Sequence, residues 1–419
     1  MSPASSRLLV AASALSVLAC GVSRVTPDTQ GTTVTAGPCG RGLVVVESDY
    51  QSTNVSLLGF SGTVLSPSLA SSSVESGGFD LGLSGDVVPP GSAVTGPDVV
   101  LIDRTPVGIL RFVDLASASV SSELPVGTGF SANPHDYLAL AEHKAYVARY
   151  ESNFNPGQQM WDQGGDVLLV DPSLTTITGR IDLTPAMAGE AAQFTPHPAR
   201  LALVAGRVFA LLASYASDYL SATTSRLVEL DPSTDSIVST LLLDGLEGCD
   251  QFAVSPDGKE LAVACTGADT LSDNPSNATS GLALVDITGT PQLTQHFSAA
   301  MFGSNPIGFA IDYVALGTLL FGTLGHFDES MAVAALDSLI QLDTASGAFQ
   351  QILQSQSQPF TLGDVRCAPE CGACFLADAE RSGGSVLRFA IGASGTLGAP
   401  NAIRAETQIG LPPRYLGVF

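Results

Sequence analysis

One repeated motif constrains the fold of this chain more than any other feature. The motif is an apolar stretch that ends in aspartate and is followed by a short polar turn. Its five clear copies, spaced 57, 60, 55 and 57 residues apart, end at Asp114, Asp171, Asp231, Asp286 and Asp343. Degenerate copies at Gly59 and Ile391 extend the series to seven. Even spacing over seven copies indicates a repeat architecture in which each repeat is one supersecondary unit.

Each repeat contains about four short runs rich in β-forming residues, separated by turn residues. In the fifth repeat these runs are residues 250–254, 260–265, 282–286 and 292–297, with a tight turn at 255–259. No segment beyond the N-terminal leader has a helical period. Four antiparallel strands per repeat, arranged radially, form the blade of a propeller. The sequence therefore predicts an all-β fold, a seven-bladed β-propeller of four-stranded antiparallel blades.

The two ends of the chain predict how the ring closes. The first repeat has three candidate strands, at 43–47, 55–59 and 63–67, but no innermost strand. The C-terminal segment 410–419 has the proline-then-apolar pattern that opens other repeats. We expect this C-terminal strand to complete the first blade, which leaves no free sheet edge.

Several segments resemble the repeat of YVTN-type bacterial β-propellers. The strongest match is Ser255-Pro-Asp-Gly-Lys-Glu-Leu-Ala-Val263, and segments 133–147 and 230–235 are similar. The resemblance covers roughly residues 42–419 and implies the propeller fold. It implies no activity, because propellers carry many unrelated functions.

The N-terminus has the pattern of an export signal. Arg7 precedes the apolar run 8–18, which is shorter than the ~20 residues needed to cross a bilayer. The run ends in Val-Leu-Ala-Cys20, which resembles the bacterial lipobox, although Leu18 replaces the usual small residue. This resemblance implies a lipoprotein signal peptide at 1–19, a lipid on Cys20, a flexible tether at 20–41 and the propeller at 42–419. An ordinary signal peptide with a chance cysteine is the alternative.

The expected location is the bacterial cell envelope. The resemblance to lipoproteins, with Gly21 and not aspartate after the cysteine, implies the outer membrane, on its periplasmic or its outer side. We expect the lipid to be the only contact with the membrane. The chain has 40 acidic and 17 basic residues and a net charge of -23, which argues against nucleic acid as a partner. We expect a monomer.

Six cysteines remain after the lipidation site, and an even number in an exported chain indicates disulfides. Cys249 and Cys265 lie at ends of adjacent strands that antiparallel pairing brings together, so we expect them to bond. Two of Cys367, Cys371 and Cys374 can pair locally and leave the third for Cys39, and the sequence does not select among these pairings. Their spacing matches that of radical SAM enzymes, but those use a different fold in a reducing compartment. A zinc site is the other alternative.

Long connections between the second and third strands of four blades predict a functional face. They cover residues 151–165, 214–225, 267–281 and 325–337, whereas the turns on the opposite face are short. Loops on a rigid scaffold commonly carry function. Trp161, the only tryptophan, lies in the first of these loops, and it is either an exposed anchor for a sugar or protein or a packing residue.

The same face holds the mouth of the central tunnel, where polar residues near the starts of the innermost strands converge. The expected residues are His135, Asp136, His197, Asp250, Gln251, Asn305, Asp364 and Arg414. They are either a binding site or groups that merely solvate the tunnel. No nucleophile elbow, zinc-binding helix motif, phosphate-binding loop or haem motif is present.

Two functions follow from these features. We favour a non-enzymatic envelope lipoprotein, without a cofactor, whose long-loop face binds a protein or a glycan. The alternative is a propeller enzyme at the tunnel mouth, a metal-dependent lactonase or a lyase. A metal-dependent enzyme requires His135, His197, Asp250 and Asp364 to meet around one divalent cation.

Overall fold

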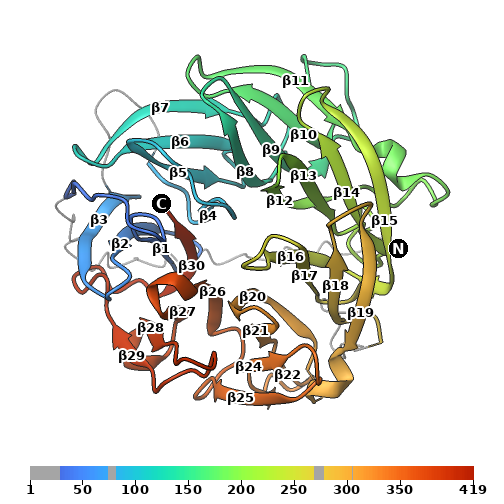
Figure 1. The fold of residues 1–419 in the computed structure, drawn as a ribbon. Coiled ribbons are helices and arrows are strands. Elements are labelled where there is room, and N and C mark those ends of the chain that lie inside the picture. Colours follow the sequence, from blue (N-terminus) through green and yellow to red (C-terminus); the bar gives the residue numbers. More distant parts are fainter. Residues whose placement is uncertain (1–28, 74–81, 269–277, 304) are drawn as a thin grey trace, which may run out of the picture.

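Seven four-stranded antiparallel sheets form a ring around one axis (Figure 1). The computed structural model describes residues 29–73, 82–268, 278–303 and 305–419, so the expected signal peptide and Cys20 lie outside the described residues. The prediction of a seven-bladed β-propeller is confirmed.

Each blade runs from an innermost strand at the axis to an outermost strand at the rim. Blade 1 consists, in that order, of β30 (Pro413–Val418), β1 (Leu43–Ser48), β2 (Thr53–Leu58) and β3 (Val64–Ser71). Blade 2 consists of β4 (Val87–Val88), β5 (Asp98–Asp103), β6 (Ile109–Asp114) and β7 (Ser119–Pro125). Blade 3 consists of β8 (Pro134–Ala141), β9 (Lys144–Ser152), β10 (Gly164–Asp171) and β11 (Thr176–Asp182). Blade 4 consists of β12 (Pro198–Val204), β13 (Arg207–Leu212), β14 (Thr224–Asp231) and β15 (Ser236–Glu247).

The remaining blades follow the same order. Blade 5 consists of β16 (Cys249–Val254), β17 (Glu260–Cys265), β18 (Gly281–Asp286) and β19 (Gln292–Ser298). Blade 6 consists of β20 (Ile307–Ala315), β21 (Thr318–Thr323), β24 (Ser338–Asp343) and β25 (Phe349–Gln354). Blade 7 consists of β26 (Leu362–Ala368), β27 (Ala373–Asp378), β28 (Ser385–Ala390) and β29 (Asn401–Ile403).

Short elements lie in the connections. A small hairpin within the long loop of blade 6 pairs β22 (His326–Phe327) with β23 (Val333–Ala335). The 3-10 turns are η1 (Thr184–Met187), η3 (Ala299–Phe302), η4 (Pro369–Cys371) and η5 (Arg381–Gly383). In the described ranges, no helix is long and apolar enough to cross a membrane.

The repeated aspartate ends the third strand of five blades, and its side chain shapes the turn that follows. Asp114 Oδ1 accepts a hydrogen bond of 2.8 Å from the backbone N–H of Ser117. Asp286 Oδ1 accepts an equivalent bond of 2.8 Å from Thr288. An aspartate in this position supplies a local acceptor that starts the turn to the outermost strand. The repeat spacing seen in the sequence is therefore the spacing of these turns.

Seven of the eight hydrophobic clusters of the described chain lie one between each pair of neighbouring blades, and the eighth packs Tyr150 and Tyr215 between blades 3 and 4. Each sheet is covered on both faces by its neighbours. Its inner strands are therefore buried at successive positions and do not alternate between buried and exposed residues; all six residues of β1 are buried. Burying a leucine or phenylalanine in such an interface stabilises the fold by about 1.5–3 kcal/mol.

The C-terminal strand closes the ring, as predicted. β30 pairs antiparallel with β1, with Leu43 opposite Val418 and Val45 opposite Leu416. Leu416 is fully buried in the cluster between blades 7 and 1. The first blade therefore contains strands from both ends of the chain, which lie side by side in Figure 1.

Three disulfides resolve the pairing that the sequence left open. Cys249 bonds Cys265 across the first two strands of blade 5, as predicted. Cys367 bonds Cys374 within blade 7, and Cys371 bonds Cys39. The last bond links the N-terminal segment to blade 7.

Residues 29–41, which belong to the predicted tether, contact the propeller. The backbone N–H of Gln30 donates to the Ser68 carbonyl oxygen at 2.9 Å, and that of Thr32 donates to the Leu115 carbonyl oxygen at 2.6 Å. Between them, a Cβ added to Gly31 would lie 2.0 Å from the Ala116 oxygen, so only glycine fits there. With the Cys39–Cys371 bond, this segment joins blades 2, 1 and 7.

Candidate functional site

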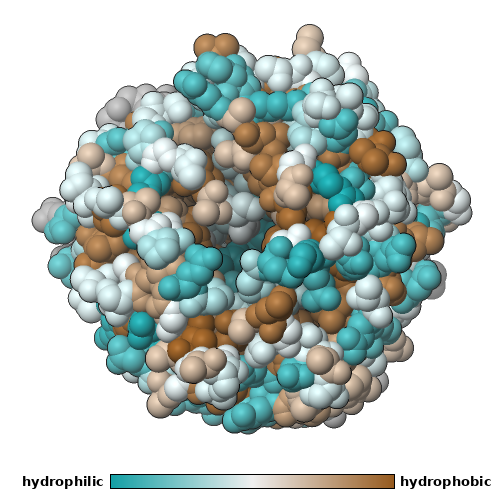
Figure 2. Space-filling view, viewed as in Figure 1, coloured by the Kyte–Doolittle hydropathy of each residue, from teal (hydrophilic) through white to brown (hydrophobic). Residues whose placement is uncertain are grey.

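A cavity of about 470 Å³ lies on the propeller axis. The innermost strand of every blade contributes to its wall, so the cavity is the mouth of the central tunnel. These strand residues are Val88, His135, Ala199, Arg200, Asp250, Gln251, Phe309, Asp364 and Tyr415. The face shown in Figure 2 is hollowed near the centre of the ring. Four predicted residues, His135, Asp250, Gln251 and Asp364, do meet at this site.

Aromatic side chains form one side of the cavity. His135 stacks on Tyr150, with ring centroids 3.9 Å apart, and Tyr219 reaches the cavity from the long loop of blade 4. The Tyr150 hydroxyl lies 3.3 Å from Asp250 Oδ1, and the Tyr219 hydroxyl donates to Glu151. These contacts fix the aromatic wall and leave its rings beside polar groups. Burial, together with the nearby charges of Arg104 and Arg200, lowers the pKa of His135 well below its usual range, so its ring is neutral.

Asp250 has a strongly perturbed pKa. Burial raises the pKa of this carboxyl to about 7, although the Tyr150 hydroxyl and the positive charge of Arg200 oppose the shift. A carboxyl group that titrates near neutral pH can both accept and donate a proton there. Asp250 is therefore the residue of the cavity best suited to acid–base chemistry.

Arg200 brings a positive charge into the cavity wall. Its Nε donates to Gln251 Oε1 at 2.6 Å, and its Nη1 lies 4.0 Å from Asp136 Oδ1, at the outer limit of an ion pair. Nη1 is buried and makes no hydrogen bond with the described residues. Burial lowers the pKa of Arg200, mainly because its charge loses contact with water.

Asp136 does not line the cavity, although the sequence suggested that it would. Alternation along β8 turns it away from His135, and it is fully buried. Its carboxylate accepts backbone N–H bonds of 2.8 Å from Gly91, 2.9 Å from Tyr137 and 2.8 Å from Leu201. Because these residues belong to blades 2, 3 and 4, Asp136 joins three blades.

His197 lies behind the cavity wall. It is 1% exposed, and its ring packs against Tyr150, Tyr215 and Tyr219 at centroid distances of 4.7, 6.1 and 5.2 Å. Neither ring nitrogen makes a well-formed hydrogen bond with the described residues, although backbone groups of Tyr150 and Tyr215 lie near them. Burial lowers the pKa of His197 to about 4. The residue supports the tyrosines and does not contact the cavity.

The last two predicted tunnel residues also lie outside the axial cavity. Asn305 donates through Nδ2 to the Leu336 carbonyl oxygen at 2.8 Å and holds the loop of blade 6. Arg414 lines a separate hollow of about 190 Å³, next to the axial cavity, and donates to the Phe360 carbonyl oxygen at 2.9 Å.

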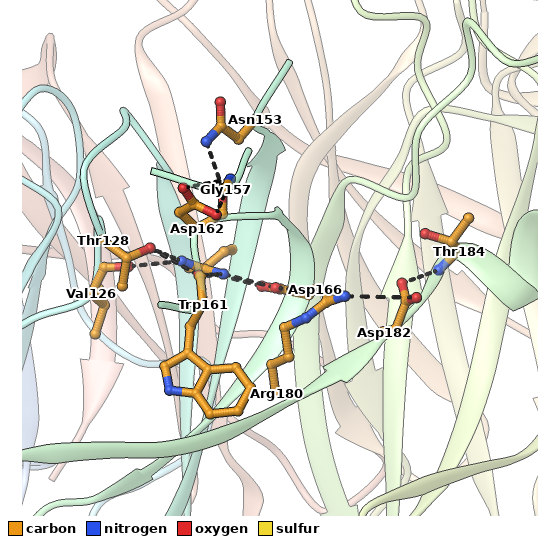
Figure 3. Close-up of polar contacts among 11 residues, drawn as sticks. Val126, Thr128, Asn153, Gly157, Trp161, Asp162, Asp166, Arg180, Asp182 and Thr184 are labelled. Carbon is orange, nitrogen blue, oxygen red and sulfur yellow. Dashed lines mark hydrogen bonds and ion pairs between the residues drawn. The ribbon is translucent and has the colours of Figure 1, made fainter. Parts of the chain in front are cut away.

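Trp161 is half-buried against the cluster between blades 2 and 3, and it does not line the cavity. Its carbonyl oxygen accepts hydrogen bonds from Thr128 at 2.9 Å and from Arg149 at 2.6 Å. Arg149 is itself held by both oxygens of Asp166, at 2.8 and 2.7 Å. In Figure 3 the indole points away from these polar contacts.

The loop that precedes Trp161 is fixed by Asp162. Its carboxylate accepts backbone N–H bonds of 2.7–2.9 Å from Gly157, Gln158 and Gln159, and its carbonyl oxygen accepts a bond from Asn153 (Figure 3). These contacts give the loop a defined shape. They favour a packing role for Trp161, and its role as a binding anchor stays a prediction.

The arrangement of donor groups around the cavity decides whether a metal ion could bind there. Among the residues that the structure describes, no three His, Cys, Asp or Glu side chains are grouped so that they could hold a metal ion. His197 is turned behind the tyrosines, and His135 stacks flat on Tyr150. The donor set that a metal-dependent lactonase would need does not fit these side chains.

Sequence reasoning missed several residues of the cavity, including Arg200, Phe309, Arg104 and Tyr415. Arg200 lies two residues after Pro198, whereas His135 directly follows Pro134, so the strand-opening pattern did not single out Arg200. The sequence does not single out Tyr415 or Arg104 either. They reach the cavity only because closure of the ring brings blades 1 and 2 together around the axis.

Comparisons with known proteins identify the fold and no family. No protein-family model and no curated protein matches the chain. Among solved structures, a periplasmic gluconolactonase of Pseudomonas aeruginosa is similar, with a TM-score of 0.55 and 13% identity over 90% of this chain and 98% of the other. The Cps50 (Swd1) β-propeller domain of Myceliophthora thermophila has a TM-score of 0.50 and 14% identity over 84% and 97%. At these identities the similarity shows the propeller fold alone.

Proposed function

We propose that this protein is a non-enzymatic binding lipoprotein of the bacterial cell envelope whose axial cavity takes up a glycan. The observation that carries the proposal is the composition of the cavity wall, in which tyrosines adjoin carboxylate, amide and guanidinium groups. Sugars need aromatic and polar surfaces together, because their C–H faces pack on aromatic rings and their hydroxyl groups require hydrogen-bond partners.

The size of the cavity supports a small ligand. Its volume of about 470 Å³ lies within the ~300–1,000 Å³ of typical ligand pockets, so it suits one or two sugar rings. A flat protein surface would not enter it. Of the two partner classes that the sequence suggested, the glycan therefore fits this site better than the protein.

The envelope location rests on the N-terminal sequence and on the disulfides. Three disulfides suit an oxidising compartment outside the cytoplasm. Diacylation of Cys20 would supply a stable anchor, since one acyl chain alone binds a membrane only marginally. Metabolic labelling with palmitate, compared between the natural chain and Cys20→Ser, tests the anchor; incorporation into both chains would contradict it.

Calorimetric titration with a panel of mono- and disaccharides tests the binding site. We expect Tyr219→Ala to weaken binding roughly tenfold, because it removes an aromatic surface from the cavity. Trp161→Ala should leave the affinity unchanged. The reverse pattern, loss with Trp161→Ala alone, would place the site on the outer loop and contradict the proposal.

Lactone hydrolysis is the second candidate function, and the pKa of Asp250 near 7 favours it. In that reaction, ionised Asp250 takes a proton from water as the water attacks the lactone carbonyl, and Arg200 stabilises the oxyanion. The ring C–O bond then breaks, and its oxygen takes the proton that Asp250 removed from the water. The similar fold named a gluconolactonase motivates δ-gluconolactone as the test substrate. Hydrolysis that Asp250→Asn abolishes would favour the enzyme over the binding protein.

A further inference from the structure

Arg200 is a buried cation that the protein leaves incompletely paired. The residue is 8% exposed and lines the axial cavity, and its Nη1 has no hydrogen-bond partner among the described residues. A buried donor without an acceptor is costly, and for a charged group the cost is higher. Because the Arg200 side chain lines the cavity, its incompletely paired guanidinium is placed where a ligand can supply an acceptor.

The neighbouring carboxylates do not fill this role. Asp136, 4.0 Å from Nη1, already accepts three backbone N–H bonds. Asp364 accepts the backbone N–H of Leu416 at 3.2 Å. Asp250 interacts with Arg200 only through charge, and burial favours its protonated form.

Arg104, the second cation of the cavity wall, differs from Arg200 because its guanidinium has a carboxylate partner within the protein. Its Nε donates to Asp86 Oδ1 at 2.9 Å, and it lies over the ring of Tyr415. Asp86 therefore neutralises Arg104 within the protein. Of these two arginines, Arg200 is the one that remains available to an anionic ligand.

We propose that Arg200 binds the carboxylate of an acidic sugar, a hexuronate, in the axial cavity. This inference rests on the proposed function and names the ligand class. The planar guanidinium matches a carboxylate in shape and forms charge-assisted hydrogen bonds with it. Gln251 and the tyrosine hydroxyls of the wall suit the sugar hydroxyl groups.

The charge around the cavity favours a carboxylate over a phosphate. Asp364 and Glu151 also line the wall, and the whole chain carries a net charge of -23. One negative charge on the ligand is offset by Arg200, whereas the second charge of a phosphate would meet these carboxylates.

Titration of the natural protein with D-glucuronate and D-glucose tests the inference, because these sugars differ only at C6. We expect glucuronate to bind roughly 10- to 100-fold more tightly than glucose. Arg200→Met should abolish this preference, and Arg200→Lys should retain part of it. Arg404→Met, which removes an exposed arginine at the end of blade 7, is the matched control and should keep the full preference.

The outcomes separate the inference from the proposed function. Equal affinity for both sugars would overturn the carboxylate anchor and leave glycan binding intact. No binding of any sugar in the panel would overturn both. Because the comparison of the two sugars uses the natural protein, it holds even if Arg200→Met does not fold, which a melting curve would reveal.

Discussion

Replacing Asp250 with asparagine should change the pH dependence of stability in a defined way. The carboxyl has a pKa of about 7 in the folded protein against an ordinary value of 3.8. The folded state therefore holds this proton to a higher pH than the unfolded state does. An acid whose pKa is raised by folding costs no stability while it stays protonated. The free energy of unfolding therefore falls as the pH rises from about 4 to about 7.

The size of the effect follows from the two pKa values. A rise from 3.8 to about 7 corresponds to about 4 kcal/mol, at ~1.4 kcal/mol per pH unit. Asp250 borders a cavity that water can enter, so screening reduces this figure to about 2–4 kcal/mol. The asparagine that replaces it has no charge to bury, and its carbonyl oxygen can still accept the hydrogen bond from Tyr150.

Chemical denaturation of both proteins at a series of pH values measures the difference. We expect the free energy of unfolding of Asp250→Asn to match that of the natural protein near pH 4 and to exceed it by about 2–4 kcal/mol at pH 8. Other titrating groups cancel in this comparison. A difference that stays constant over the whole range would refute the reasoning.

Asp257→Asn is the control for the sign of this effect. Asp257 lies in the exposed hairpin turn of blade 5, where hydrogen bonds from Ser255 and Lys259 lower its pKa. An acid with a lowered pKa stabilises the fold above its unfolded pKa, and this contribution is lost in acid. The variant should therefore be less stable than the natural protein at neutral pH and approach it as the pH falls.

Three further perturbations test the architecture. Deleting residues 413–419 removes the closing strand with the buried Leu416 and Phe419. Loss of these two side chains alone should lower the free energy of unfolding by about 4–10 kcal/mol, so we expect circular dichroism to show no cooperative unfolding. Melting like that of the intact chain would contradict ring closure. Cys39→Ser opens a link over 332 residues and should lower stability by about 2–5 kcal/mol in denaturant titrations, an effect that reductant should abolish. Asp136→Ala leaves three buried backbone N–H groups without an acceptor and should cost about 3 kcal/mol or more, whereas a neutral result would show that Asp136 does not join the blades.

The fold was predictable because its determinants are local and repeated. Asp114, Asp286 and their equivalents mark the same turn in successive blades, and each turn is made by contacts within a few residues. The closing strand was also predictable, since the first repeat lacks a strand that the C-terminus can supply.

The cavity was only partly predictable because it is built from residues far apart in the sequence. The start of each innermost strand points to the axis, which places His135, Asp250 and Asp364 correctly. Which of two neighbouring residues faces the cavity depends on strand orientation, and this separates His135 from Asp136. The pairing of Arg104 with Asp86 and the incomplete pairing of Arg200 arise only from packing between blades.

A crystal structure of the protein grown with D-glucuronate tests the central claim most directly. The account predicts one sugar in the axial cavity, with its carboxylate on Arg200 and a ring face against the tyrosines of blades 3 and 4. A sugar bound only at the outer loops around Trp161, or an axial cavity that contains only water at saturating sugar, would contradict it.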